Sequence, residues 1–183
     1  MKVRSARSAA LETPRANPVA IRPYQPSDQP GVEWLYARTP PWGRTYPRPQ
    51  PIPDDIRHIA EAFEYVIVAV EQDRAGEATI GLATVGKPDR TGGVPLPDFI
   101  DLTRRTARLH HVSVVPERWR QGIGRMLVRD AIAWARGAGY QSVLLDTTTE
   151  QAGAVAFYHA LGFQNAGHTA FREWEIVWFR FDL

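Results

Sequence analysis

The 183-residue chain contains no cysteine. This absence excludes disulfide bridges, thiolate zinc sites, iron–sulfur clusters and a cysteine nucleophile. Lysine is also scarce, with only Lys2 and Lys87 beside many arginines, and we interpret this bias as genomic base composition. No apolar run approaches the roughly 18 residues that cross a bilayer. We therefore expect a cytoplasmic protein without a membrane partner.

The chain has little net charge, only +2 at neutral pH. Most of the excess lies in the first 17 residues, where Lys2 and three arginines face only Glu12. We predict that residues 1–17 form a flexible basic tail, without the apolar segment of a secretory signal, and that residues 18–183 form one domain. A nearly neutral domain is not expected to bind nucleic acid. A nucleic-acid module that uses the arginine tail is kept as an alternative.

Hydrophobic periodicity and breaker residues predict an α+β fold. Strands are expected at Val19–Pro23, Tyr65–Val70, Thr79–Val85, Arg108–Val115 and Val143–Asp146, with one or two closing strands that include Trp174–Phe181. Helices are expected from Ser27 or Asp28 to Arg38, from Asp54 or Asp55 to Phe63, at Gln121–Arg136 and at Glu150–Leu161. Early hairpins and a late βαβ crossover imply a mixed sheet that is covered by helices.

The most informative stretch is His110–Gly124, which runs from a strand through Pro116 into a helix that begins at glycines. Gly122 and Gly124 allow a ligand to approach the backbone, and the free N–H groups of a helix start bind anions. Positive charge is added there by Arg118, Arg120 and Arg125. A dinucleotide fingerprint would need glycine where Leu127 stands, and the lysine of a P-loop is absent. The stretch therefore predicts a phosphate cradle of another kind.

Two motifs together resemble the GNAT superfamily of acyl-CoA-dependent N-acyltransferases. They are the strand at 112–114 with Pro116 and Gly122-Ile123-Gly124, and the segment AVAFYHALGF at 154–163. The resemblance implies a single GNAT-like domain with a mixed, mostly antiparallel twisted sheet flanked by helices. It also implies acetyl-CoA as cosubstrate, and no metal is expected.

In that family the pattern Q/R-x-x-G-x-G/A binds the pyrophosphate of coenzyme A, and here it falls on residues 119–124, with Trp119 in place of Gln or Arg. The resemblance also implies strands that splay apart around pantetheine, with an oxyanion-binding N–H near 112–114. Arg104, Arg105 and Arg108 are either a contact to the 3′-phosphate or, as we favour, a solvated charged segment. The implied cofactor-binding residues are Val112, Ser113, Val114, Arg120, Gln121, Gly122, Ile123, Gly124, Arg125 and Gln151.

Acyl transfer to an amine needs a proton donor for the thiolate and a proton acceptor for the amine. The resemblance points to Tyr158 as donor. His110 and Asp146 compete as base, and water is a further alternative. Strand alternation predicts that His110 shares a face with Val112 and Val114 and that His111 points to the other face.

These features predict an N-acetyltransferase that moves the acetyl group of acetyl-CoA to a small-molecule amine by direct attack. The alternative is a non-catalytic acyl-CoA-binding sensor with the same fold. We expect the acceptor to bind to the segments that resemble the family least. They are the loop with Trp42 and Tyr46, the acidic helix after Asp54, and the closing strands near His168. Whether two copies associate as a homodimer is left open.

Overall fold

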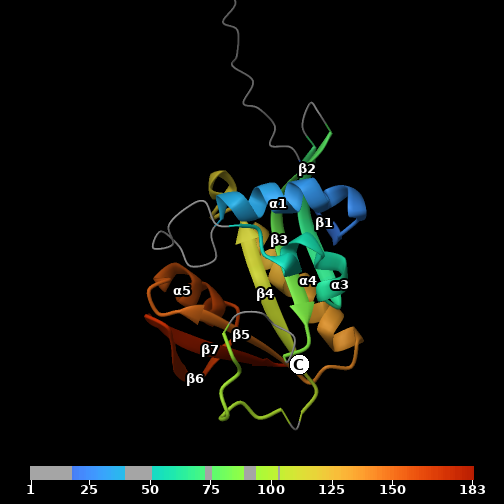
Figure 1. The fold of residues 1–183 in the computed structure, drawn as a ribbon. Helices are drawn as coiled ribbons and strands as arrows, with labels where there is room; N and C mark the ends of the chain where they lie inside the picture. Colours follow the sequence, from blue (N-terminus) through green and yellow to red (C-terminus); the bar gives the residue numbers. More distant parts are fainter. Residues whose placement is uncertain (1–17, 40–50, 73–75, 89–93, 103) are drawn as a thin grey trace, which may run out of the picture.

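The computed structural model describes residues 18–39, 51–72, 76–88, 94–102 and 104–183. Its helices are α1 (Gln29–Arg38), α2 (Asp54–Arg57), α3 (Ile59–Ala62), α4 (Ile123–Gly137) and α5 (Ala152–Ala160), with short 3₁₀ turns η1 (Pro26–Asp28) and η3 (Pro116–Arg118). Its strands are β1 (Val19–Pro23), β2 (Tyr65–Gln72), β3 (Glu77–Gly86), β4 (Thr106–Val114), β5 (Ser142–Thr148), β6 (Gln164–Phe171) and β7 (Trp174–Asp182). Figure 1 shows how these elements are arranged.

All seven strands join one sheet in the order β1-β2-β3-β4-β5-β7-β6. Every neighbouring pair is antiparallel except β4 and β5, which run parallel because α4 carries the chain back between them. The predicted α+β class, with a mostly antiparallel sheet flanked by helices, is therefore confirmed. None of the described helices is long and apolar enough to cross a bilayer.

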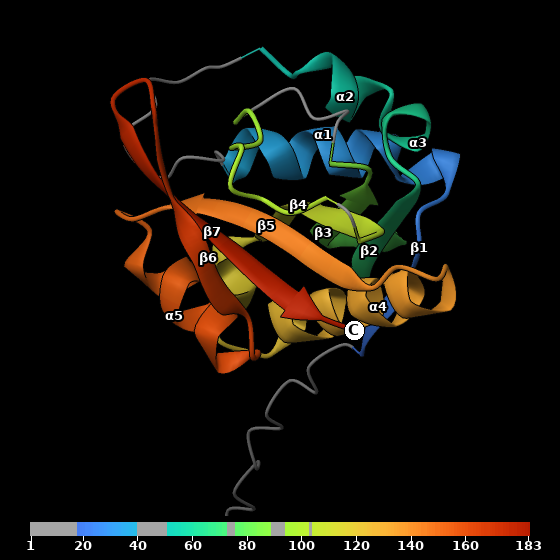
Figure 2. The same ribbon diagram turned by 90° about the horizontal axis from the view of Figure 1, so that it is seen from below.

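Helices cover both faces of the sheet, with α1, α2 and α3 on one side and α4 and α5 on the other (Figure 2). Alternate residues of β5 and β7 enter two different hydrophobic clusters, as strand geometry requires. Val143 and Phe179 belong to the main core with α4 and α5, whereas Leu144 and Trp178 belong to a smaller cluster. The two faces at this end of the sheet therefore have separate packing and can carry separate functions.

The predicted elements are all present, with differences at their ends. Helix α4 begins at Ile123 rather than Gln121, because Gly122 adopts a left-handed backbone with φ of 84°. The helix expected over 54–63 is two short helices that meet at His58. The predictions for the tail at 1–17, for Trp42 and Tyr46, for the hairpin turn at 73–75 and for parts of the 86–103 excursion lie outside the described residues.

Candidate active site

Two adjacent strands separate in the middle of the sheet. β4 and β5 pair only over Thr106–Arg108 and Ser142–Leu144. Beyond these residues β4 continues along β3 as far as Val114, and β5 continues along β7 as far as Thr148. The splay implied by the family resemblance is therefore present. Main-chain polar groups of β4 beyond Arg108 border this interruption of the hydrogen-bond ladder, which we call the opening.

The first turn of α4 presents free N–H groups. Gly122 is the N-cap, no side chain caps the turn, and the turn holds no acidic residue. The first N–H with a partner inside the helix is that of Met126, which donates to the carbonyl of Gly122 at 3.0 Å. The preceding N–H groups and the positive end of the helix dipole make this turn suited to an anion such as pyrophosphate.

Gly124 shows where this turn lies. A Cβ on Gly124 would lie 3.4 Å from the Phe157 ring of α5 and 3.9 Å from the side chain of Val114 at the end of β4. The turn is thus next to both the opening and α5. A Cβ on Gly122 would meet nothing within 4 Å, so its positive φ rather than crowding favours glycine there.

The basic residues of the turn have different tasks. Arg118 donates two hydrogen bonds to Glu71 of β2, at 2.8 and 2.7 Å, and so ties the turn to the sheet. These bonds raise the pKa of Arg118 further. Arg120 and Arg125 are exposed and remain available to an anion. Trp119 is 60% exposed, and its indole N–H donates to the carbonyl of Val114 at 2.6 Å.

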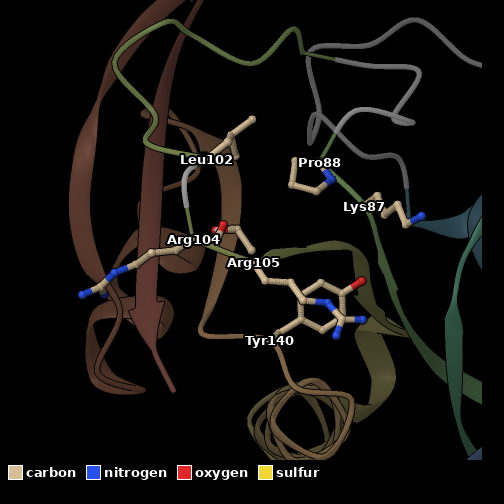
Figure 3. A pocket seen from close by; sticks show the side chains of 7 residues that line it. Lys87, Pro88, Leu102, Arg104, Arg105 and Tyr140 are labelled. Atoms are coloured by element: carbon tan, nitrogen blue, oxygen red, sulfur yellow. The ribbon is translucent and has the colours of Figure 1, made fainter.

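The second basic run does not reach this turn. Arg104 and Arg105 precede β4, and its nine residues separate them from Val114 by roughly 30 Å at 3.3 Å per residue. They line a pocket of about 310 Å³ with Lys87 and Tyr140 (Figure 3). There Arg105 stacks on Tyr140 at 4.6 Å and Arg104 pairs with Asp182 at 3.5 Å. A 3′-phosphate held at α4 is out of their range.

Arg108, the last residue of that run, is not solvated as we expected. It is 2% exposed and donates to the Asp146 carboxylate at 2.7 Å. The same guanidinium donates to the carbonyl of Val94 at 3.0 Å and lies 4.9 Å from the Trp178 ring. The structure therefore gives Asp146 a structural partner, and its role as base stays a prediction.

Tyr158 lies on α5 and is 8% exposed. Its ring packs against the rings of Phe157, Phe163 and Phe179 at centroid distances of 5.2 to 5.9 Å. Burial raises the pKa of Tyr158, and the negative charge of Asp146 raises it further. The hydroxyl therefore keeps its proton at neutral pH, which a proton donor requires.

Gln151 precedes α5 at its N-cap. Its side-chain oxygen accepts a hydrogen bond from the hydroxyl of Thr147 at 2.7 Å. This bond holds Gln151 at the end of β5, next to the opening. The residue is thus where the resemblance places a pantetheine contact, and that role remains a prediction.

The predicted faces of the two histidines on β4 were wrong. Thr84 pairs with His110 and Leu82 pairs with Ser113, so two residues of β4 stand opposite Ala83. This β-bulge interrupts the alternation. The rings of His110 and His111 both pack on Phe63, at 5.8 and 5.4 Å, on the side of the sheet that carries α1, α2 and α3.

Val114 faces the opposite side of the sheet from the histidines. It pairs with Gly81, where a Cβ would lie 3.1 Å from Leu127 of α4. His110 therefore does not share a face with Val114.

The environments of the two histidines differ. The Nε2 atom of His110 is buried and has no hydrogen-bond partner among the described residues. Burial, helped by the nearby charge of Arg108, lowers the pKa of His110 well below its usual value. His111 is instead paired with Asp55 of α2, with 3.3 Å between Nε2 and Oδ2. Sequence reasoning placed Asp55 only on an acidic helix, because a contact across 56 residues leaves no local signal.

The profile of the acetyltransferase (GNAT) family matches residues 31–163, and the chain belongs to this family. The match includes the splayed strands, the α4 turn and the α5 tyrosine, so it covers the whole site. The family predicted from the two motifs is confirmed.

Individual relatives carry related names. N-acetyltransferase 8 of Homo sapiens is 40% identical over 83 residues, which cover 45% of this chain and 36% of that protein. N-acetyltransferase 8B of Homo sapiens is 39% identical over 83 residues, which also cover 45% of this chain and 36% of that protein. The chain thus spans about a third of the length of these curated relatives.

Solved structures share the fold at lower sequence identity. The yncA protein of Salmonella typhimurium, solved with its cofactor acetyl-CoA, has a TM-score of 0.69 and 20% identity over 90% of this chain and 94% of that chain. NAA60 of Arabidopsis thaliana, in complex with acetyl-CoA, has a TM-score of 0.71 and 15% identity over 91% of this chain and 99% of that chain. At such identities the likeness establishes the fold.

Proposed function

We propose that the protein is an N-acetyltransferase that moves the acetyl group of acetyl-CoA to a small-molecule amine. The observation that carries this proposal is the opening between β4 and β5 with the uncapped start of α4 beside it. A helix start binds the pyrophosphate, and an opening in a sheet lets an extended chain reach the other face. The names of the relatives and the acetyl-CoA in two neighbours support the same cosubstrate.

The residues divide the chemistry between them. The N–H groups of Ile123, Gly124 and Arg125 hold the diphosphate, with Arg120 and Arg125 adding charge. Main-chain N–H groups of β4 near Val112 to Val114 stabilise negative charge on the thioester carbonyl oxygen. The amine nitrogen forms a bond to the carbonyl carbon, the carbon–sulfur bond breaks, and Tyr158 gives its proton to the leaving sulfur. The proton lost by the amine passes to a base or to water.

No protein nucleophile is required for this direct transfer, in keeping with a chain that has no cysteine. We also keep as proposals a cytoplasmic location, the absence of nucleic-acid and membrane partners, and a monomer or homodimer.

Two measurements test the proposal. Coenzyme A and acetyl-CoA are expected to raise the melting temperature of the protein in proportion to the logarithm of their concentration. Thiol release from acetyl-CoA is then followed with n-butylamine, phenethylamine, spermidine and a tripeptide with a free N-terminus, and the amide is identified by mass spectrometry. Tight binding of coenzyme A without thiol release on any amine would instead support the non-catalytic sensor.

A further inference from the structure

The backbone of His111 is left-handed. Its φ is 50°, in the left-handed region that non-glycine residues rarely adopt. Such a conformation costs free energy and persists only where surrounding contacts fix it. Here the centroid of the ring lies 5.4 Å from that of Phe63 and 6.2 Å from that of Tyr36 in α1. Its Nε2 atom is paired with the carboxylate of Asp55. The bulge on β4 thus turns His111 into a defined position between α1 and α2.

The pairing with Asp55 sets the state of the imidazole. Burial raises the pKa of Asp55, but the hydrogen bond and the charge interaction with His111 outweigh it, so this pKa is lowered. Asp55 is therefore ionised at neutral pH. An ionised carboxylate at Nε2 favours the tautomer with hydrogen on Nε2, which leaves Nδ1 as the proton acceptor.

His110 is a weak proton acceptor. Its pKa is lowered well below the usual value by burial and by the charges of Arg108 and His111. Among the described residues, the buried Nε2 of His110 has no hydrogen-bond partner, whereas Nε2 of His111 has the carboxylate of Asp55, which orients the ring.

The residues of the site lie on two opposite faces of the sheet. The α4 turn and Tyr158 lie on the face that carries α4 and α5, whereas His111 and Asp55 lie on the face of α1, α2 and α3 (Figure 2). If the diphosphate and the leaving sulfur belong to the first face, the amine reaches the carbonyl carbon from the second. Among the described residues, the titratable groups from packed elements that face His111 are Asp55 of α2, Tyr36 of α1 and the adjacent His110.

We infer that His111 accepts the proton from the acceptor amine and that Asp55 is its positioning residue. The inference rests on the proposed acetyl transfer. As the amine nitrogen bonds to the carbonyl carbon, one N–H bond breaks and its proton goes to Nδ1 of His111, while Tyr158 supplies a different proton to the sulfur. Two faces of the sheet thus supply the two proton-transfer groups.

The variant His111→Gly gives the sharpest test, because glycine adopts the left-handed backbone without strain and leaves space where the ring was. The amine of the panel with the fastest wild-type rate is used. The variant is expected to bind coenzyme A as the wild type does and to lose about 10²-fold or more in kcat/KM. Added imidazole is expected to restore part of the amide formation, which is measured by mass spectrometry so that acetylated imidazole is not counted.

Asp55→Asn tests the positioning role through a comparison of kcat with KM. Without the carboxylate the imidazole loses the partner that fixes its tautomer, so kcat is expected to fall by about 10-fold while the KM for the amine stays as in the wild type. His58→Gln is the matched control, since this exposed histidine lies three residues from Asp55 and takes no part in the site. Its kcat and KM are expected to match the wild type.

The outcomes separate the inference from the proposed function. A wild-type protein that releases no thiol with any amine refutes the proposed function and the inference with it. A wild type that turns over, with a His111→Gly variant that is equally fast or that imidazole does not rescue, refutes the inference alone. An unchanged kcat in Asp55→Asn, or a loss that lies in KM alone, refutes the positioning role.

Discussion

The two faces of the opening between β4 and β5 are built in different ways. On the face of α4 and α5 the groups that would hold a ligand are mainly backbone N–H groups of a helix start. On the face of α1, α2 and α3 they are side chains that meet over long sequence separations, such as His111 with Asp55 and Arg108 with Asp146. By our proposal the first face is a cofactor face and the second an acceptor face.

This difference explains which face tolerates substitution. Backbone donors survive a change of side chain as long as the turn keeps its shape, so Trp119 can replace the polar residue of the family pattern. A site made from side chains changes with each of its members. Acceptor choice is therefore expected to vary where cofactor binding does not.

The largest expected effect comes from Tyr158→Phe on the cofactor face. The variant keeps the ring contacts with Phe163 and Phe179 and loses only the hydroxyl. Turnover is expected to fall by about 10² to 10⁴-fold, since a proton donor contributes in this range. The dissociation constant for coenzyme A, measured by calorimetry, is expected to stay within about 3-fold of wild type because the hydroxyl is no part of the diphosphate site.

Unchanged turnover in Tyr158→Phe would remove this residue from its role. It would also contradict the proposal that each face supplies one proton-transfer group, because the leaving sulfur would then need a proton donor from elsewhere.

The next effect concerns the ion pair on the acceptor face. Asp146→Ala leaves the guanidinium of Arg108 buried without its carboxylate, which is expected to lower the free energy of unfolding by about 3 kcal/mol. Urea denaturation measures the loss. Asp182→Asn is the control, because that carboxylate is 66% exposed and its ion pairs with arginine contribute little.

The same ion pair decides between the two predicted roles of Asp146. In Asp146→Asn the amide still accepts a hydrogen bond from Arg108, so enough folded protein is expected for kinetics. If the acidic limb of kcat/KM persists, Asp146 is structural. Loss of that limb with His111 intact would make Asp146 the base.

The α4 turn and the helix that carries Tyr158 could be predicted from the sequence, because both depend on local features. Gly122, Gly124 and the spacing to Pro116 act within one turn of chain, and Tyr158 follows from its own segment. The order of strands and the crossover through α4 could be predicted for the same reason.

The acceptor face could not be predicted in the same way. The bulge at His111 shifts the alternation by one residue, and strand periodicity alone does not reveal it. The burial of Arg108 depends on Val94, Asp146 and Trp178, which come from three distant segments. Contacts of this kind leave no pattern in a single sequence.

A smaller effect compares the two groups of arginines. Arg120→Gln and Arg125→Gln are expected to weaken coenzyme A binding by about 3- to 10-fold each, and less at high salt, because both are exposed at the α4 turn. Arg104→Gln and Arg105→Gln are expected to leave it unchanged, since they lie at the far end of β4. Equal weakening by all four would mean that binding depends on overall charge rather than on the turn.

The smallest expected effect is on the pH dependence of stability, and it tests whether His110 differs from His111 as the structure indicates. The pKa of His110 is lowered in the folded protein, so below the ordinary value of about 6.5 the unfolded chain takes up a proton that the folded protein does not. Stability is therefore lost as pH falls below about 6.5, until the lowered pKa is reached. His110→Gln removes this dependence, and its loss of stability between pH 7 and 5.5 is expected to be about 1 kcal/mol smaller than that of wild type.

Urea denaturation at the two pH values measures that difference, with His58→Gln as the exposed-histidine control. The comparison depends only on the slope with pH, so a general change in stability from the substitution does not affect it. A variant with the wild-type slope would mean that His110 titrates normally in the folded protein. The acceptor face would then have two candidate bases, His110 and His111, in place of one.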